Sequence, residues 1–512
     1  MPAYVNTIES SCAPQRSRPS PWPRRAVWLA RGRVLVALLV LGTSSRGLAE
    51  EGCSLASGRP WHEYRSLHFV IDAAGWDREP ALLVAAFEDL YAAVLAALVA
   101  EPVEIPAQVR VIVLPRERDL ADYTGSRDII GLFWVSPLGQ PTILISADHV
   151  EHLPQVVAHE LTHYVSSYLF PRQPYWFAEG LAQFVEGVGK VDGEGRRWAG
   201  SDPAGGWAAG SVKLAPMAYL LAGELAGYDA NPYLTSWILY RFLWNDRGKQ
   251  LSEYQRRLMD GEAPEDAWRL TFPEWDLASG KVNRLDGRVS QHQRNGRGLR
   301  WEIKIGNVDR TFSYRPASAG DVHLALLGLR LFHSNPLIHA RIRRQALEEA
   351  IREEPGHPVV SAELARLREV PLLPALRSAA GAKPTDGRGW FLLALEATDA
   401  GERETALRLA VEHWPDGALA HAVLAGQLAV TGRAREALPL ANRAVDLAPW
   451  HPTAVSTLAT VAVELGQCKQ ALILQTRAVE AVQSKGFGSQ DTSATEVRDR
   501  LGEIRKRCAT AR

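Results

Sequence analysis

The amino-acid sequence predicts an α+β protein in which a small sheet and its helices precede an all-α domain of helical repeats. Three observations predict this fold class. Runs of β-branched residues alternate with apolar helical segments between residues 60 and 150. An H-E-x-x-H pattern lies within the apolar, helix-like run 153–169. Toward the carboxyl end, several residue types recur at a spacing of 34.

Length, charge and cysteine content limit the classes of protein to consider. The chain has 512 residues, enough for two or three domains with sizeable cores. Lys plus Arg and Asp plus Glu both number 58, so the net charge is near zero. This balance argues against a nucleic-acid-binding protein or a binder of anionic membranes. Four cysteines are too few for a disulfide scaffold, although an oxidising compartment would permit Cys468 to pair with Cys508.

Residues 1–49 are expected to be a polar leader followed by a secretory signal peptide. Four arginines between residues 24 and 33 precede the apolar run 34–41, and the small residues Gly47 and Ala49 end the segment. The apolar run is too short to span a bilayer, and an uncleaved anchor beginning near Ala26 is the alternative. We therefore expect a secreted, periplasmic or cell-envelope protein without a stable membrane span.

The residues before the H-E-x-x-H pattern are expected to form the sheet and one long helix. Alternation, helical spacing and β-branched composition predict these elements in turn. The expected strands are residues 64–71, 109–114, 129–135 and 142–146, with a helix over 80–100 and a turn at 137–140.

The expected chemistry centres on residues 159–163, which read H-E-L-T-H. Side chains four residues apart lie on one face of a helix, so His159 and His163 can bind one metal ion. Glu160 follows the first histidine directly and can reach a water molecule on that metal. Two imidazoles, a carboxylate and an open position suit Zn²⁺. The alternative is that both histidines are ordinary core residues.

A second segment offers the carboxylate. Residues 174–182 read P-Y-W-F-A-E-G-L-A, and Pro171 and Pro174 break the chain between the two helices so that it can turn back. Together the two segments resemble the gluzincin-type zinc metallopeptidases, specifically the peptidase MA-like domains. Their pattern is HE-[LI]-x-H followed by Pro-x-Trp-x-x-Glu-Gly-[LI]-Ala.

The resemblance implies a zincin-like domain over residues 60–292, with His159, His163 and Glu179 as zinc ligands and Glu160 as catalytic base. It also implies an edge strand, just before the zinc helix, that holds the peptide substrate by β-pairing. Residues 142–146 are our candidate for that strand, and 129–135 are the rival. One gluzincin subgroup has Asp four residues after the ligand Glu. Here that position is Gln183, which leaves open what orients the first histidine.

A helix is expected to open at Asn231-Pro232 and to stop at 246–248. The resemblance places a tyrosine in its first turn, which makes Tyr233 the candidate donor to the oxyanion formed during hydrolysis. The alternative is that Tyr233 and Tyr240 pack this helix against the core. The basic stretch 281–300 is expected to be a solvated loop, and 293–319 a linker.

Residues 320–512 are expected to be an all-α domain that resembles the tetratricopeptide repeat (TPR). Gly432 and Gly466 lie 34 residues apart, and several alanines, leucines and prolines keep the same period. Two repeats occupy 416–449 and 450–483, and diverged units end at Pro415 and Pro355. Repeats of this kind usually contact proteins or peptides.

These features predict a zinc-dependent peptide-bond hydrolase whose repeat domain contacts proteins. An endopeptidase is favoured because no Gly-x-Met-x-Asn segment, which meets the substrate amine in related aminopeptidases, is visible. Expected partners are a peptide or protein substrate and a protein bound by the repeats, with no nucleic acid. The alternative is a non-catalytic repeat scaffold with a vestigial or structural zinc site.

Overall fold

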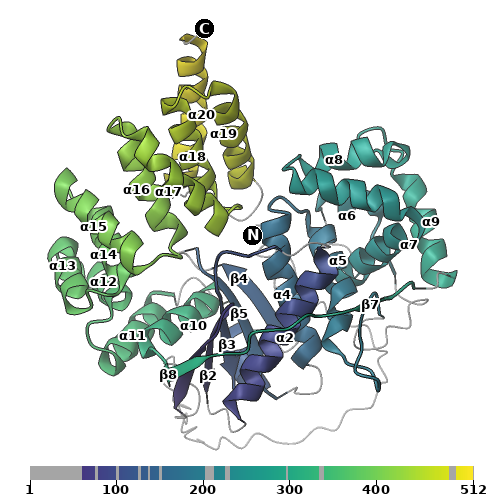
Figure 1. Cartoon of the computed structure of the whole chain (residues 1–512), viewed down its shortest axis with the longest axis horizontal. Coiled ribbons are helices and arrows are strands. Elements are labelled where there is room, and N and C mark those ends of the chain that lie inside the picture. Colours follow the sequence, from purple (N-terminus) through teal and green to yellow (C-terminus); the bar gives the residue numbers. More distant parts are fainter. Residues whose placement is uncertain are drawn as a thin grey trace, which may run out of the picture.

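The structure is a computed structural model with α+β architecture, in which a mixed sheet and its helices are followed by a curved array of helices (Figure 1). The expected signal segment 1–49 lies outside the described part of the chain. The structure describes residues 60–74, 79–99, 103–124, 129–135, 139–148, 153–201, 213–224, 231–295, 298–333, 339–483 and 492–510.

Six strands form the central sheet, in the order β4-β5-β3-β2-β1-β8. The parallel strands β2, β3 and β5 lie in the middle, and β1, β4 and β8 run antiparallel to their neighbours. Every residue of β2, β3 and β5 is buried, as expected of strands covered on both faces. The strands are β1 (Trp61–Arg65), β2 (Phe69–Ala74), β3 (Val109–Leu114), β4 (Gly131–Val135), β5 (Pro141–Ser146) and β8 (Ser313–Pro316).

Two strand predictions are wrong. The single strand expected over 64–71 is interrupted by a turn at 66–68, which Glu88 holds by accepting hydrogen bonds from Ser66 Oγ (2.7 Å) and the His68 N–H (3.1 Å). The segment 142–146 is not an edge strand, because β5 pairs with β3 on one side and β4 on the other. The rival segment supplies the edge as β4.

Helices cover both faces of the sheet. On one face, α2 (Pro80–Leu98) and α4 (Leu153–Leu169) pack on alternate strand residues such as Ile71, Val111 and Ile143. On the other face, α3 (Glu117–Thr124) and α10 (Ala319–His333) pack on Ile112 and Leu144. Among the described residues, α2 is long and apolar enough to cross a membrane, but its buried side chains place it in the core of this domain.

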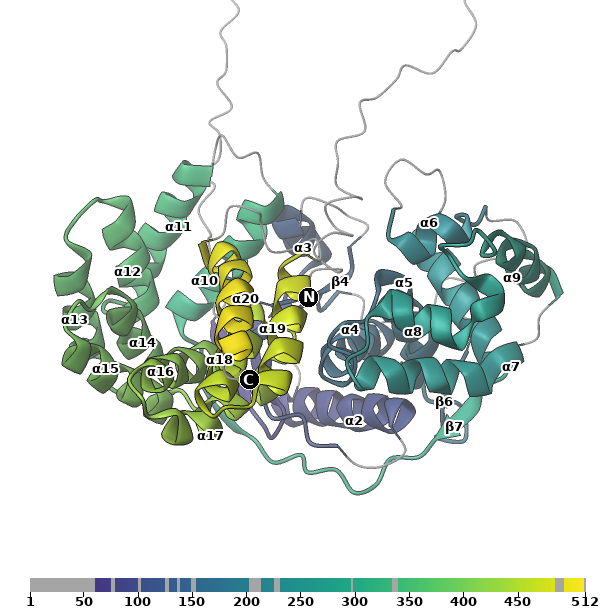
Figure 2. The ribbon, with the colours of Figure 1, turned by 90° about the horizontal axis from the view of Figure 1, so that it is seen from above.

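The middle of the chain, from residue 175 to 303, is largely helical. Its elements are α5 (Tyr175–Val185), η2 (Glu186–Gly189), β6 (Arg197–Ala199), α6 (Met217–Ala222), α7 (Pro232–Met259), α8 (Pro264–Thr271), η3 (Pro273–Trp275), α9 (Asn283–Asn295) and β7 (Trp301–Ile303). They stand on the side of the sheet domain opposite the helical array (Figure 2).

Three predictions for this region are corrected. Helix α7 does not stop at 246–248 but is kinked at Arg247, where φ is −138°. The basic stretch 281–300 contains α9, because Val282, Leu285 and Val289 form a buried apolar stripe at helical spacing. The expected linker 293–319 contains β7, which pairs with β6, and β8, which completes the central sheet.

The carboxyl-terminal region is an array of paired helices. The two clear repeats correspond to α16 with α17 and α18 with α19, and each pair turns at a glycine, Gly432 or Gly466, with φ near +80°. Cys468 and Cys508 form a disulfide between α19 and α20. The helices are α11 (His339–Glu353), α12 (Pro358–Leu367), α13 (Leu372–Ala382), α14 (Gly387–Glu396), α15 (Ala400–His413), α16 (Ala418–Val430), α17 (Ala434–Leu447), α18 (Pro452–Glu464), α19 (Cys468–Gln483) and α20 (Thr492–Thr510).

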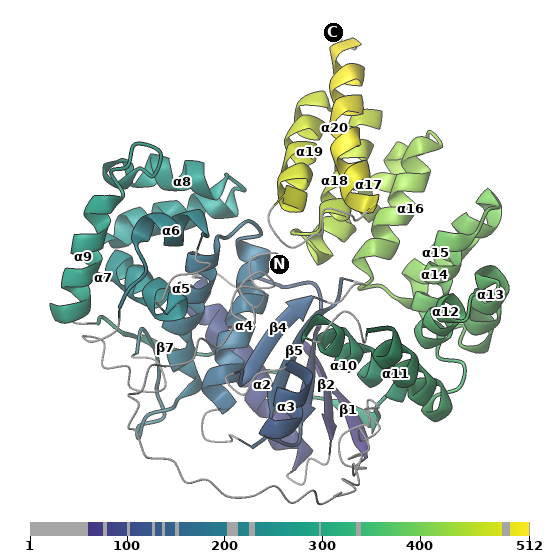
Figure 3. The same ribbon diagram turned by 180° about the vertical axis from the view of Figure 1, so that it is seen from behind.

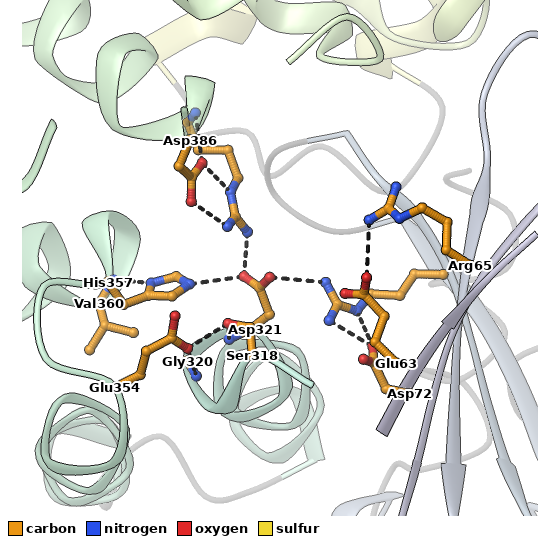
Figure 4. A network of polar contacts seen from close by, with 12 residues as sticks. Glu63, Arg65, Asp72, Ser318, Gly320, Asp321, Glu354, His357, Val360 and Asp386 are labelled. Atoms are coloured by element: carbon orange, nitrogen blue, oxygen red, sulfur yellow. Dashed lines mark hydrogen bonds and ion pairs between the residues drawn. The ribbon is translucent and has the colours of Figure 1, made fainter. Parts of the chain in front are cut away.

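A buried junction network joins the repeats to the sheet (Figure 4). Its members are Asp72, Arg110, Asp321, His357 and Arg388. In β3, Arg110 pairs with Asp72 of β2 at 2.6 Å and with Asp321 of α10 at 3.4 Å. The other oxygen of Asp321 meets His357 Nε2 at 3.0 Å and the Arg388 guanidinium. The network therefore fixes α10, α12 and α14 against the strands.

The repeats also contact the last turn of α4. The Tyr168 hydroxyl donates to the Leu447 carbonyl at 3.1 Å, and its ring lies 4.8 Å from that of Trp450. Just beyond α4, Arg172 pairs with Glu480 of α19 at 2.8 Å. The array is thus attached to the sheet domain at two separate places.

Candidate metal centre

Helices α4 and α5 bring the predicted ligands together. His159 and His163 stand one turn apart on α4, and the turn at 170–174 returns the chain so that α5 lies against α4. Gly180, directly after Glu179, allows α7 to pack closely. A Cβ at this position would lie 2.6 Å from the Ser236 carbonyl oxygen. The glycine of the Glu-Gly-Leu-Ala segment therefore sets how close α5 can approach α7.

Three side-chain atoms of the metal cluster, defined here as His159, His163 and Glu179, form a compact triangle. The two Nε2 atoms are 3.2 Å apart, and each lies 3.6 Å from Glu179 Oε2. A point equidistant from these atoms lies roughly 2.0 Å from each, which matches Zn–N and Zn–O distances. Among the residues that the structure describes, this is the group of His, Cys, Asp and Glu side chains able to hold one metal ion.

The carboxylate of Glu179 is fully buried. Among the described residues, neither oxygen has a donor within hydrogen-bond distance, and the two histidine Nε2 atoms lie just beyond it, 3.6 Å from Oε2. Burial alone would raise its pKa, but His163 and His159 lower the pKa to about 2. A buried anion of this kind is strongly destabilising unless a cation accompanies it. The donor set and the burial therefore fit a divalent metal such as Zn²⁺.

Glu186, outside the metal cluster, contacts the ring of the first histidine, His159. The sequence had left open which residue orients this ring. Glu186 Oε2 lies 3.2 Å from His159 Nδ1. If Nδ1 carries the proton, Nε2 is left free to bind a metal. Burial would lower the pKa of His159, but the nearby carboxylates of Glu179 and Glu186 raise it well above its usual value. Gln183 takes a different role, because its amide donates to the Tyr233 carbonyl oxygen at 2.9 Å.

Glu160 lies beside the start of the edge strand. It is buried, with 4% of its surface exposed. A Cβ on Gly131, the first residue of β4, would lie 3.1 Å from Glu160 Oε1 and 2.5 Å from a methyl group of Val156. The absence of a side chain at Gly131 thus lets the strand pass directly over the predicted catalytic base.

The structure separates the two tyrosines of α7. Tyr240 is buried, packs against Phe177 and Phe184, and accepts a hydrogen bond from Gln255. It is therefore a core residue. Tyr233 is 37% exposed, and its ring lies 6.2 Å from that of Tyr175, one turn before Glu179 on α5. Both tyrosines therefore contact α5, but only Tyr233 of the two keeps an exposed surface.

No protein-family model matches the chain, and no curated relative does either. Several solved structures are similar to parts of it. A MamA protein is 12% identical, with a TM-score of 0.24 over 33% of this chain and 94% of its own. The thermophilic TPR protein TTC0263 of Thermus thermophilus is 20% identical, with a TM-score of 0.27 over 36% and 99%. The human IFIT1 dimer with PPP-AAAA is 13% identical, with a TM-score of 0.26 over 59% and 72%.

These similarities are too low to carry an argument about function. The assignment of the repeats therefore depends on the chain itself, through its helix pairs, its period of 34 residues and the glycine turns. On these grounds, the carboxyl-terminal region is an array of TPR-like helix pairs.

Proposed function

We propose that this protein is a zinc-dependent peptidase that hydrolyses peptide bonds within a polypeptide. The observation that carries the proposal is the buried Glu179 carboxylate, which has no donor within hydrogen-bond distance among the described residues and is equidistant from two imidazole nitrogens at 3.6 Å. A carboxylate that only stabilised the fold would be expected to receive hydrogen bonds. Glu160, beside an edge strand, adds a base at the place where a peptide can bind.

His159, His163 and Glu179 would hold the zinc ion, which when bound lowers the pKa of a water molecule and polarises a carbonyl group. Glu160 takes the proton from the attacking water and later gives it to the leaving amine. Glu186 fixes the ring of His159. The Tyr233 hydroxyl is the candidate hydrogen-bond donor to the oxygen on which negative charge develops.

The backbone of β4 would hold the substrate. Alternate residues of an edge strand direct their N–H and C=O groups away from the neighbouring strand. A peptide that pairs with this edge would present its carbonyl groups at Gly131, where Glu160 lies. Because such pairing does not require a free terminus, it suits cleavage within a chain.

We further propose that the protein works in an oxidising compartment, either secreted or in the cell envelope. The Cys468–Cys508 disulfide supports this, since such bonds are rare in reducing cytosol.

The first test replaces the catalytic base. Glu160→Gln should retain zinc but lose roughly 10²- to 10⁴-fold in turnover, because an amide cannot accept the proton. The measurement is cleavage of an unbiased peptide library, with and without a chelator, alongside zinc content. Glu265→Gln, an exposed position on α8, is the matched control. Undiminished turnover in Glu160→Gln would contradict the mechanism.

The second candidate function is a non-catalytic scaffold in which zinc only ties α4 to α5. The repeat array favours it, because such arrays usually contact proteins. In that case wild-type protein with one zinc per chain would cleave no library peptide. Removing zinc would lower thermal stability, while Glu160→Gln would leave partner binding unchanged.

A further inference from the structure

The edge strand β4 runs alongside the proposed zinc helix α4 (Figure 3). At the start of the strand, Gly131 lies over Glu160. Two residues later, the ring of Phe133 lies 6.3 Å from that of Tyr164, one helical turn after Glu160. Two strand residues advance roughly 6.8 Å and four helix residues roughly 6 Å, so the elements stay in register.

The far end of β4 meets the repeats. Val135, the last residue of the strand, and Tyr168, one turn beyond Tyr164, both pack against an apolar cluster that contains Leu447 and Trp450. Leu447 ends α17, and Trp450 lies in the turn before α18. The strand that begins at the predicted catalytic base therefore ends at the junction of two repeats.

The distance from the predicted catalytic base to the repeats corresponds to only a few residues of an extended peptide. From Gly131 to Val135 the strand covers roughly 13 Å. Among the described strands, β4 pairs only with β5, which leaves its second edge available for a peptide. A peptide paired with this edge advances at the same rise per residue, so it reaches the repeats about four residues from the scissile bond.

We propose that the α16–α18 repeats form a second substrate-binding surface, and that the substrate is an extended polypeptide continuing on one side of the scissile bond to these helices. This inference rests on the peptidase function proposed above. A polar pair lies beside this apolar cluster, with Arg443 on α17 and Asp416 in the turn before α16. Arg443 Nη2 lies 3.3 Å from Asp416 Oδ1 and 3.5 Å from the Pro106 carbonyl oxygen. Both charged side chains are more than a third exposed and can contact a passing chain.

The test uses a set of peptides of different length that all contain the same peptide bond, one that the enzyme has been found to cleave. The shortest has two residues on each side of that bond, and others are extended to six residues on one side or the other. For the wild type, extension on one side alone should raise kcat/KM by about tenfold, with the gain appearing near the fourth residue, because distant contacts stabilise the bound chain. Extension on the other side should have little effect.

Arg443→Ala should lose most of this gain while still cleaving the shortest peptide at the wild-type rate. The matched control is Arg408→Ala, since Arg408 pairs with Glu404 and Glu436 inside the repeats. That variant should keep the full length dependence. Fluorescence anisotropy can measure binding of the longest peptide to the Glu160→Gln variant. Adding Arg443→Ala to this variant should weaken that binding.

The possible outcomes separate the two proposals. Suppose the shortest peptide is cleaved, but kcat/KM is the same for every peptide length or rises equally with extension on either side. That result would overturn the second surface and leave the peptidase function standing. An unchanged gain in Arg443→Ala would overturn its location on the repeats. Failure of the zinc-loaded wild type to cleave any peptide would overturn both.

Discussion

Two buried groups of charged side chains lie close to the same sheet, and they differ in how their carboxylates are satisfied. In the junction network, Asp321 meets His357 and Arg388 through one oxygen and Arg110 through the other. In the metal cluster, neither oxygen of Glu179 has a donor within hydrogen-bond distance among the described residues, and the two histidine nitrogens lie 3.6 Å away. Both groups combine acidic side chains with histidine, but only the junction network also contains arginine.

The difference lies in the balance of charge. Burial would raise the pKa of Asp321, but Arg388 and Arg110 hold it well below its usual range. Within the same network, burial outweighs Arg110 at Asp72 and raises its pKa to about 6. In the metal cluster, the carboxylates of Glu179 and Glu186 raise the pKa of His159 against the effect of burial. The junction network balances its carboxylates with arginines, whereas the metal cluster has only histidines to balance Glu179.

The largest effect is expected from removing the carboxylate of the metal cluster. Glu179→Ala should weaken zinc binding by more than about 10³-fold, beyond the 10- to 100-fold typical of an outer partner, because two neutral imidazoles remain. Competition with a chromogenic chelator measures this affinity. Asp321→Asn, in the junction network, should bind zinc as the wild type does. Full zinc occupancy in Glu179→Ala would remove the contrast between the two groups.

Asp321→Asn should instead destabilise the fold by about 3–5 kcal/mol, because it leaves Arg110 and Arg388 without their shared anion. Urea unfolding measures this loss. Since the native pKa of Asp321 is depressed, its contribution is present above the ordinary Asp pKa and is lost as pH falls below about 4. The difference between wild type and variant should therefore shrink in acid. A constant difference from pH 7 to pH 3 would contradict this account.

Tyr233→Phe tests whether the functional site extends from the metal cluster to α7. We expect kcat to fall by roughly 10- to 10³-fold with zinc content unchanged, because an oxyanion donor is lost. Tyr240→Phe serves as the matched control, since that hydroxyl accepts a hydrogen bond from Gln255 within the core. An equal kcat in the wild type and Tyr233→Phe would leave zinc as the sole oxyanion stabiliser.

Glu186→Gln should produce the smallest of these effects. Zinc affinity should fall by about 10- to 100-fold, because the amide orients the His159 ring less strongly than a carboxylate does. Glu186→Asp should restore part of the affinity if the shorter side chain still reaches Nδ1. Unaltered zinc affinity in Glu186→Gln would mean that another group fixes the ring.

The parts of the candidate site that depend on local spacing could be predicted from the sequence. His159, His163 and Glu179 lie on two helices whose periodicity and proline break can be read directly, and the structure brings these side chains together. Glu186 was missed because the family pattern points to the position four residues after Glu179. Glu186 follows Glu179 by seven residues, a spacing that places two side chains on the same face of a helix. This spacing could have pointed to Glu186.

Long-range pairing could not be predicted in the same way. The apolar run at 142–146 resembled an edge strand, yet its continuous burial shows an interior strand. The strand β8 has four exposed residues and no apolar alternation, so nothing local marked it. Its partner β1 lies in a distant part of the sequence, and the pairing became visible only in the folded sheet.

The pairing of β8 with β1 also sets the order in which the domain can be completed. Glu63 of β1 and Arg315 of β8 form an ion pair across 252 residues of sequence. A chain emerging amino end first therefore exposes α4 and α5, the two helices of the metal cluster, well before the strand that completes the sheet exists. Closing so long a loop is entropically costly and slow. The sheet domain would thus be finished only as the repeats begin to emerge, so the proposed peptidase activity would be delayed until the proposed second substrate-binding surface is about to follow.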